Sequence, residues 1–239
     1  MLIQLEKITK EYRRSGEEKF AALRDVDLVI EAGEMVALMG PSGSGTSTLL
    51  NIIGCLDVAT GGRYLLDGVD VARLSKRRLA RLRGRQIGFV FQSFTLIPDV
   101  TVGRNVELPL VYARSRKVRR QRANAALTQV GLEGHQDDMP VELFTAQQEK
   151  VVIARALIND PPILLDDEPT NDLDAESTNE IMGLLTDLSA SGRTVVFCTH
   201  EAEVAARAHR VVQLQDGAVV SDHPTASAPK RRPTHLRAV

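Results

Sequence analysis

The chain has 239 residues, of which 43% are hydrophobic and 26% are charged, and its formal net charge is −1. These values predict a globular protein with a sizeable core, and the small net charge argues against nucleic acid as a partner. The two cysteines, Cys55 and Cys198, form no C-x-x-C pair, so we expect buried thiols in a reducing compartment rather than a zinc site. With no signal-peptide pattern and no apolar run of about 20 residues, the chain is expected to be cytoplasmic.

The N-terminal part is expected to form strands over residues 2–5, 22–30 and 35–39. A glycine-rich turn follows the third strand and leads into an apolar helix at 49–53. A turn of this kind between a buried strand and a helix is typical of a phosphate-binding loop. The alternative, a merely flexible turn, would not require the strand before it or the helix after it. The motif is G-x-x-x-x-G-K-[ST], and Thr46 takes the place of its lysine.

The middle of the chain changes from alternating strands and helices to mostly helix. A strand and turn are predicted at 61–68, a basic helix at 74–83, and an apolar strand at 87–91 that ends at Gln92. Three helices are expected next, at 108–116, 118–130 and 141–157. Because strands and helices alternate on both sides of this block, we expect a helical subdomain, about 93–158, inserted into an α/β core.

The C-terminal part returns to alternating strands and helices. A buried strand at 163–165 ends in the acidic run Asp166-Asp167-Glu168, and a second at 194–199 ends at His200. Helices are predicted at 174–188 and 201–208, before a hairpin of strands 211–214 and 218–220. The domain is expected to end at residue 222. Residues 223–239 carry Lys230-Arg231-Arg232 in a segment typical of a disordered tail; a solvated tail is favoured over a weak contact with lipid headgroups.

Four polar groups each follow a predicted apolar strand: the glycine-rich loop, Gln92, Asp167-Glu168 and His200. If the strands are parallel, these groups meet at one edge of the sheet, where open α/β sheets bind ligands. A magnesium nucleotide requires such an arrangement, with Ser47 and Asp167 at the metal and a carboxylate to polarise water. An isolated acid pair or a single histidine would be weak evidence, but together they indicate a nucleotide site.

With these motifs, residues 1 to about 220 resemble the ATP-binding subunits of ABC transporters, closest to the lipoprotein-releasing and macrolide-exporting branch. The resemblance implies an α/β fold: a P-loop NTPase core of mostly parallel sheet, an N-terminal antiparallel β subdomain and an inserted helical subdomain. ATP and Mg²⁺ are the implied cofactors. The implied partners are a membrane permease subunit and a second ATP-binding subunit, either itself or a homologue, which would place the chain on the inner face of the membrane.

The resemblance also implies roles for individual residues. Glu168 is the implied catalytic base, with Gln92 as the Q-loop glutamine and His200 as the switch histidine. Tyr12 would stack on adenine, and the metal would be held by Ser47, Gln92 and Asp167. The implied nucleotide-binding residues are Tyr12, Gly40, Ser42, Gly43, Ser44, Gly45, Thr46, Ser47 and Thr48. The residues implied to reach the nucleotide of the other subunit are Phe144, Thr145, Ala146, Gln147 and Asp174.

Two departures from the family pattern bear on activity. Thr46 lacks the ammonium that would donate charge-assisted hydrogen bonds to phosphate, each worth about 1.5–3 kcal/mol, so ATP affinity should fall roughly ten- to a hundredfold. In the segment that aligns with L-S-G-G-Q, Phe144, Thr145 and Ala146 replace the serine and both glycines, and their Cβ atoms would obstruct a close approach to phosphate.

These departures leave two functions open. The first is an ATP-binding transporter subunit with weakened ATP hydrolysis. The resemblance implies a dimer in which each nucleotide lies between the glycine-rich loop of one subunit and residues 144–147 of the other, so a homodimer would carry both departures at each site. The alternative is a non-hydrolysing regulatory or structural partner of the same fold. A DNA-repair ATPase is disfavoured because the sequence has no coiled-coil insertion, zinc site or basic groove.

Overall fold

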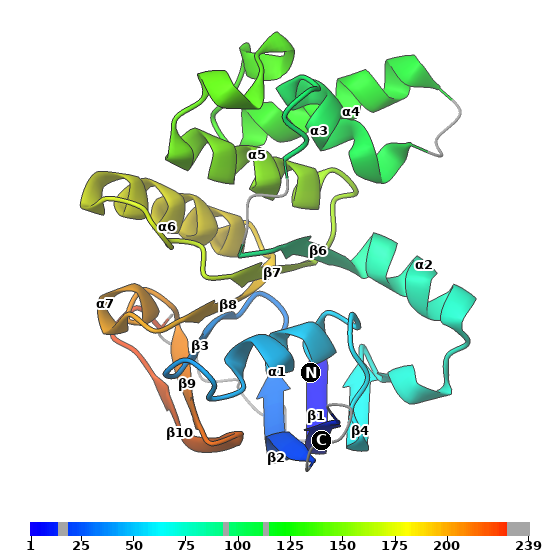
Figure 1. Cartoon of the computed structure of the whole chain (residues 1–239), viewed down its shortest axis with the longest axis vertical. Coiled ribbons are helices and arrows are strands. Elements are labelled where there is room, and N and C mark those ends of the chain that lie inside the picture. The colour runs from blue at the N-terminus through cyan, green and yellow to red at the C-terminus, as the bar shows by residue number, and fades with distance from the viewer. Residues whose placement is uncertain (14–18, 93–95, 112–114, 229–239) are drawn as a thin grey trace, which may run out of the picture.

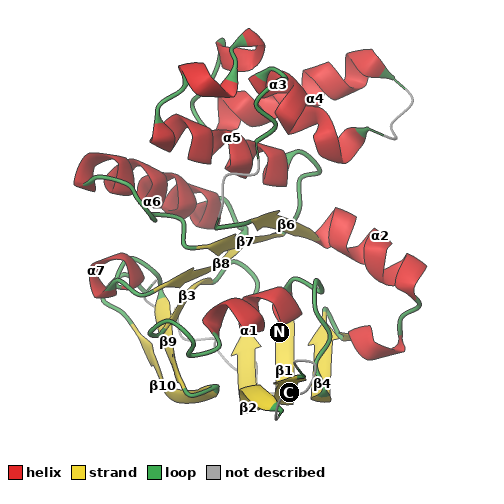
Figure 2. Cartoon of the chain, in the orientation of Figure 1, coloured by secondary structure: helices red, strands yellow, loops and turns green. Residues whose placement is uncertain are grey.

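The computed structural model describes residues 1–13, 19–92, 96–111 and 115–228. Two sheets form the lower part of the molecule in Figure 1, and a group of helices forms the upper part. Figure 2 shows the same division by secondary structure, with strands concentrated below and helices above. The predicted combination of an antiparallel sheet, a mostly parallel sheet and a helical part is confirmed.

The smaller sheet is antiparallel and has the order β2 (Phe20–Ile30), β1 (Ile3–Tyr12), β4 (Gly61–Leu66), β5 (Val69–Asp70). Strand β1 pairs with β2 on one side and with β4 on the other. The prediction that its strand stops at residue 5 was wrong. The polar residues that follow, such as Lys7, lie on the exposed side while Ile8 is buried, so the strand continues to Tyr12.

The larger sheet supplies the core. Its order is β10 (Ala218–Pro224), β9 (Arg210–Gln215), β3 (Met35–Met39), β8 (Thr194–Thr199), β7 (Ile163–Asp167), β6 (Ile87–Val90). All neighbouring pairs are parallel except β9 and β10. The central strands are buried on both faces, which explains their continuous apolar sequences.

Helices cover both faces of this sheet. Helix α1 (Thr46–Ile53) packs with Val36 and Leu38 on one face. The other face packs against α5 (Thr145–Leu157), α6 (Ala175–Ala190) and α7 (Ala202–Ala205). Helices α3 (Val102–Glu107) and α4 (Arg116–Gln129) complete the upper part, while α2 (Lys76–Gln86) leads directly into β6. Within the described ranges, no helix combines the length and apolarity that a bilayer crossing requires.

Several predicted helix boundaries were wrong, among them those of α1, which begins at Thr46 rather than at 49, and of α2, which covers 76–86 rather than 74–83. The helix expected at 108–116 is absent from the described residues 108–111: α3 precedes it, begins after Thr101, whose hydroxyl accepts the Arg104 N–H, and ends at Glu107. Leu108–Leu110 form a short 3₁₀ turn, and 112–114 lie outside the described residues. The helix expected from 141 begins at Thr145, where the Gln147 side chain accepts the Phe144 N–H. Helix α7 ends at Ala205 rather than at 208.

The C-terminal boundary of the domain also differs in detail. Strand β10 runs to Pro224, two residues into the segment predicted as a tail. The Thr225 N–H then donates to the His209 carbonyl at 3.0 Å. The basic residues 230–232 lie outside the described residues, so the disordered tail stays a prediction.

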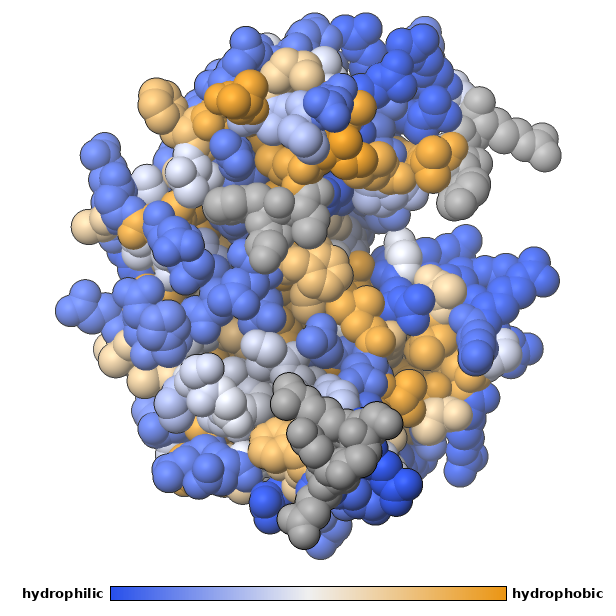
Figure 3. Space-filling view, viewed as in Figure 1, coloured by the Kyte–Doolittle hydropathy of each residue, from blue (hydrophilic) through white to orange (hydrophobic). Residues whose placement is uncertain are grey.

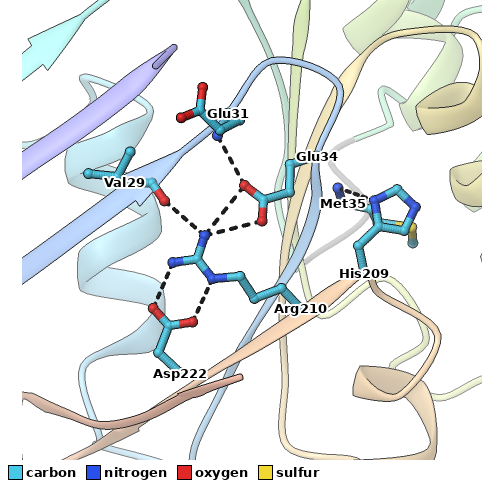
Figure 4. Close-up of polar contacts among 7 residues, drawn as sticks. All are labelled: Val29, Glu31, Glu34, Met35, His209, Arg210 and Asp222. Atoms are coloured by element: carbon cyan, nitrogen blue, oxygen red, sulfur yellow. Dashed lines mark hydrogen bonds and ion pairs between the residues drawn. The ribbon is translucent and has the colours of Figure 1, made fainter. Parts of the chain in front are cut away.

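Arg210 joins the two sheets at their shared end (Figure 4). Its guanidinium donates to the Val29 carbonyl of β2 at 2.9 Å and to Glu34 at 3.1 Å. Two further hydrogen bonds, 2.5 and 2.6 Å long, reach both carboxylate oxygens of Asp222 on β10. This bidentate geometry is typical of strong arginine–carboxylate pairs, and it fixes the entry to β3, the strand that precedes the glycine-rich loop.

Candidate nucleotide-binding site

The glycine-rich loop between β3 and α1 requires glycine at particular positions. Gly43 and Gly45 have φ angles of +84° and +103°, a region that side chains with a Cβ rarely adopt. A Cβ on Gly45 would lie 2.6 Å from the Ala22 carbonyl oxygen, and one on Gly40 would collide with Ser44. The loop is therefore packed into a defined shape, and the alternative of a flexible turn is not supported.

Contacts from distant segments hold this loop in place. The Gly217 N–H, in the turn between β9 and β10, donates to the Ser44 carbonyl at 3.0 Å. The Arg24 N–H donates in turn to the Gly217 carbonyl at 2.7 Å. The Ser44 hydroxyl is buried and has no hydrogen-bond partner among the described residues. A buried hydroxyl without a partner is costly, and an anion in the loop would provide one.

The loop presents backbone donors at the N-terminus of α1. The first intrahelical bond runs from the Leu49 N–H to the Gly45 carbonyl, so the N–H groups of residues 46–48 have no partner within the helix. Together with the partial positive charge of the helix terminus, they suit a phosphate group. Thr46 is the first residue of α1 and is half-buried; it contributes its backbone N–H to this site but no positive charge.

Ser47 and Asp167 come together although 120 residues separate them. The Ser47 hydroxyl donates to Asp167 Oδ1 at 3.0 Å. Burial raises the pKa of the Asp167 carboxyl, and the Ser47 hydrogen bond opposes that shift. In the parts of the chain that the structure describes, no three His, Cys, Asp or Glu side chains form a complete metal cage. One hydroxyl and one carboxylate nevertheless fit Mg²⁺, which prefers oxygen ligands and takes its remaining ligands from phosphates and water.

Glu168 and His200 lie next to this pair, at the ends of adjacent strands. His200 Nδ1 is 3.1 Å from Glu168 Oε2 and 3.3 Å from Oε1. Glu168 has a φ of +64°, which is strained for a residue with a side chain and is common at functional sites. Burial raises the pKa of the Glu168 carboxyl, although the His200 contact lowers it. A half-buried carboxylate with a raised pKa suits a group that must accept a proton.

Gln92 and Tyr12 lie at the margins of the site. Gln92 is exposed and follows β6, the strand beside β7, so it lies at the same sheet edge as Asp167. Tyr12 ends β1, with 40% of the residue exposed. Its hydroxyl donates to Asp57 at 2.7 Å, and Lys10 Nζ lies 4.8 Å from the ring centroid. Burial and the Asp57 hydrogen bond raise the pKa of the Tyr12 hydroxyl. The ring is thus held in one position, with part of its surface free to stack.

Residues 144–147, from the second group of predicted site residues, lie apart from the glycine-rich loop. Residues 144–147 begin α5, which packs on the opposite face of the sheet from α1 (Figure 1). Phe144 is 80% exposed, whereas Ala146 is buried. Asp174 caps α6 by accepting the Ser177 N–H at 2.8 Å, which lowers the pKa of its carboxyl. Within one chain the structure therefore places residues 144–147 on the opposite face of the larger sheet from the helix that follows the glycine-rich loop.

Comparison with known proteins gives the same result as the geometry. The family model described as "ABC transporter" matches residues 23–171, more than half of the chain. The chain belongs to the ABC transporter family. It is 49% identical to the macrolide export ATP-binding/permease protein MacB of Escherichia coli over 222 residues, which cover 92% of this chain but 34% of that protein. The ABC transporter ATP-binding protein YknY of Bacillus subtilis (strain 168) is 47% identical, over 92% of this chain and 95% of its own length.

Solved ABC structures share the fold. The ATP-binding cassette MJ0796, solved as a dimer in a post-hydrolysis state bound to ADP and Pi, has a TM-score of 0.84 and 45% identity. The match covers 93% of this chain and 98% of that one. The cassette cbiO1 from Clostridium perfringens, part of the transporter complex cbiONQ, has a TM-score of 0.83 and 28% identity over 93% of this chain and 88% of its own. The chain is thus an ATP-binding protein of the ABC type.

One pair of residues in this ABC cassette was missed by the sequence analysis. Asp166, on β7, is fully buried, and neither of its carboxylate oxygens has a hydrogen-bond partner among the described residues. Its carboxyl interacts electrostatically with that of Glu149 on α5. Burial raises the pKa of Glu149 to about 8, against the effect of the Arg155 charge, and raises that of Asp166 well above its ordinary value. Burial thus favours the protonated form of both carboxyls. The available signal was Asp166 itself, an acid directly after the apolar run 163–165, but only its neighbours Asp167 and Glu168 were assigned roles.

Proposed function

We propose that this chain is the ATP-binding subunit of a membrane transport complex and passes nucleotide-driven closure to a separate permease subunit. The main support is the hydrogen bond between Ser47 and Asp167, which joins the phosphate loop to the strand that carries Glu168. It brings together the groups needed to hold a phosphate, a metal and a water molecule. The chain would then lie at the inner face of the membrane, attached through its partner.

We assign the site residues as follows. The N–H groups at the start of α1 hold the phosphates, and the ring of Tyr12 provides a stacking surface for adenine. Ser47 and Asp167, with Gln92, would hold Mg²⁺, whose charge would offset that of the phosphates. Glu168 polarises the attacking water and accepts its proton, while His200, 3.1 Å away, orients that carboxylate until the γ-phosphate is bound.

The contact with the permease is assigned to the helical part. A cavity of about 210 Å³ lies between the loop before α3 and the start of α4. Large apolar residues line this cavity and are exposed to solvent. Their exposed fractions are 42% for Ile97, 37% for Leu108 and 61% for Val111. Exposed apolar surface of this kind marks a protein-binding site. The match to one third of the MacB chain and to nearly all of YknY supports a modular ATP-binding part.

We further propose that turnover is low. Thr46 supplies no positive charge to the phosphates, and the exposed Phe144 stands where the family has a serine that approaches the γ-phosphate of the other subunit. The second candidate, a non-hydrolysing partner protein, rests on the same two positions. The intact Glu168–His200 contact favours the first candidate, because a protein that never hydrolyses ATP has no need of it.

The deciding experiment measures ATP binding and steady-state ATPase activity of the chain and of Glu168→Gln. If the proposal holds, the variant binds ATP within about threefold of the unmodified chain, but its ATPase activity falls by two or more orders of magnitude. Glu203→Gln, an exposed residue of α7 outside the site, is the matched control and should leave both unchanged. Binding without any turnover in either protein would favour the non-hydrolysing candidate, and the absence of ATP binding would reject both.

A further inference from the structure

Helix α2 carries a group of arginines that the nucleotide site does not use. Its sequence, Lys-Arg-Arg-Leu-Ala-Arg-Leu-Arg-Gly-Arg-Gln, has six basic side chains and no acidic one. At about 100° per residue, four of them fall on one side of the helix. We name this group the arginine stripe: Arg77, Arg78, Arg81 and Arg85, all exposed. The stripe runs from Arg77 to Arg85, about 12 Å along the helix axis.

The rest of α2 is anchored to the molecule. Leu79 and Leu82, on the opposite side, pack against the core cluster around α1. Arg83 turns inward and donates to the Cys55 carbonyl at 3.0 Å. The arginine stripe is therefore held outward in a fixed orientation, at the side of the molecule in Figure 1. In Figure 3 the corresponding region is mostly hydrophilic at its outer edge.

The arginine stripe is electrostatically unfavourable within the chain alone. Its members have no ion pair or hydrogen-bonding partner for their side chains among the residues that the structure describes. Arg77, Arg81 and Arg85 are spaced four apart, where like charges repel. Lys76, Arg77 and Arg78 also occupy the first turn, with no acid beside them, although the positive end of the helix dipole disfavours cations there. Because the chain's net charge is only −1, this positive charge is a local feature.

We propose that the arginine stripe binds the phosphate groups of anionic lipids, so that α2 rests on the membrane surface. Arginine matches phosphate geometry with paired N–H donors. The remaining exposed positions of α2 are Lys76, Ala80, Gly84 and Gln86, so the outward side offers no large apolar group. Protein interfaces have an apolar centre, whereas attraction to a headgroup layer needs only charge; a lipid surface therefore fits better than an acidic protein.

This contact goes beyond the proposed function because it requires neither ATP nor a permease. It would orient the chain before it meets its membrane partner, through charge alone, since the apolar side of α2 is already packed on the core and cannot insert. With a contribution of about 1 kcal/mol per arginine near an anionic surface, each member changes the partition coefficient about fivefold. Binding should be reversible and should weaken steeply as salt is added.

The test is co-sedimentation of the full chain with vesicles of phosphatidylcholine alone and of phosphatidylcholine mixed with phosphatidylglycerol. We expect binding to the anionic vesicles only, and its loss in high salt. Arg77→Gln/Arg81→Gln should weaken it roughly 30-fold, while Arg77→Lys/Arg81→Lys, which keeps the charge, should stay within about threefold. The control Lys7→Gln/Arg207→Gln removes the same charge from exposed positions on β1 and next to α7, and should have little effect.

Two further measurements separate the possible causes. Lys230→Gln/Arg231→Gln/Arg232→Gln tests the basic C-terminal segment, and binding lost in this variant but kept in the stripe variant would overturn the proposal. Equal loss in the stripe variant and the control would overturn it as well, as would capture of the permease subunit that depends on the stripe without any vesicle binding. ATP affinity should be the same in the stripe variant and in the unmodified chain. If the unmodified chain does not bind ATP, the proposed function is rejected, but the vesicle experiment still tests the stripe.

Discussion

Thr46 occupies a position where one side chain decides the strength of a charged contact. The backbone around it has the form that phosphate binding requires: Gly45 is left-handed, the loop is packed against Ala22, and three N–H groups lack helical partners. Only the charge is missing. A neutral hydroxyl can still donate one hydrogen bond to an anionic phosphate, but it lacks the positive charge and the further N–H donors with which an ammonium attracts that phosphate.

Restoring that charge gives the first prediction. Thr46→Lys should raise ATP affinity roughly ten- to a hundredfold, since it adds charge-assisted hydrogen bonds worth about 1.5–3 kcal/mol each. Equilibrium titration with a fluorescent ATP analogue measures it. Thr46→Gln, which adds length without charge, is the matched control and should gain little. If the lysine variant gains less than about threefold in ATP affinity, the missing ammonium contributes less than about 1 kcal/mol to the binding free energy.

At the scale of elements, the contact between α5 and β7 has an unusual composition. Two acids, Glu149 and Asp166, lie close enough to interact in the interior, where such side chains are rare, and the positive charge of Arg155 acts on Glu149. They remain there because burial keeps them protonated, and protonation makes the stability of the protein depend on pH. The pKa of Glu149 is raised from 4.5 to about 8. The stabilising effect of protonated Glu149 is complete below its pKa in the unfolded chain. It is lost as the pH rises through its pKa in the folded protein.

The second prediction follows from the upward direction of the Glu149 pKa shift. Between the two pKa values, the folded state binds one more proton at Glu149 than the unfolded state, so the free energy of unfolding should fall by about 1.4 kcal/mol per pH unit from this residue. Glu149→Gln stays neutral and should remove that part of the slope. Urea denaturation at several pH values measures it, with the exposed Glu203→Gln as a control that keeps the slope. An unchanged slope in Glu149→Gln would show that Glu149 is ionised in the folded protein.

The elements also show how far sequence patterns reach. Buried strands such as 35–39 and 194–199 were predicted to the residue, because continuous apolar runs leave few alternatives. The approach of Ser47 to Asp167 was predicted as well, since parallel strands present their carboxyl ends at one edge. Helix starts set by a single side chain, as at Thr101 and Gln147, were missed because capping competes with periodicity. The Glu149–Asp166 contact depends on tertiary packing that no local pattern encodes.

For the whole molecule, the two altered regions lie on opposite faces of the larger sheet, and under the proposed function a second ATP-binding subunit would bring them together at one nucleotide. In a homodimer each nucleotide would meet the loop with Thr46 from one subunit and Phe144 from the other. In a heterodimer with an intact partner, each composite site would contain only one altered element. The choice of partner therefore changes how many defects each ATP molecule meets.

The third prediction separates these cases. If the chain acts as a homodimer, Thr46→Lys alone and Phe144→Ser/Thr145→Gly/Ala146→Gly alone should each leave ATPase activity low. The two together should raise it by more than the product of their separate effects, since the groups act as a unit at one site. Steady-state ATPase assays on all four proteins provide the cycle. Simple multiplication of the two effects would argue against a shared site, and thermal melts would show whether the glycines have weakened the start of α5.

The pinning of the phosphate loop by Gly217 has a consequence for protein synthesis. The loop is encoded near the beginning of the chain, but one of its backbone contacts comes from the turn between β9 and β10, more than 170 residues later. During translation the ribosome synthesises the loop long before it synthesises Gly217, whose N–H contacts the Ser44 carbonyl. We therefore expect the nascent chain to bind ATP only after the β9–β10 hairpin has emerged from the ribosomal exit tunnel. Chains stalled before that point should bind ATP poorly.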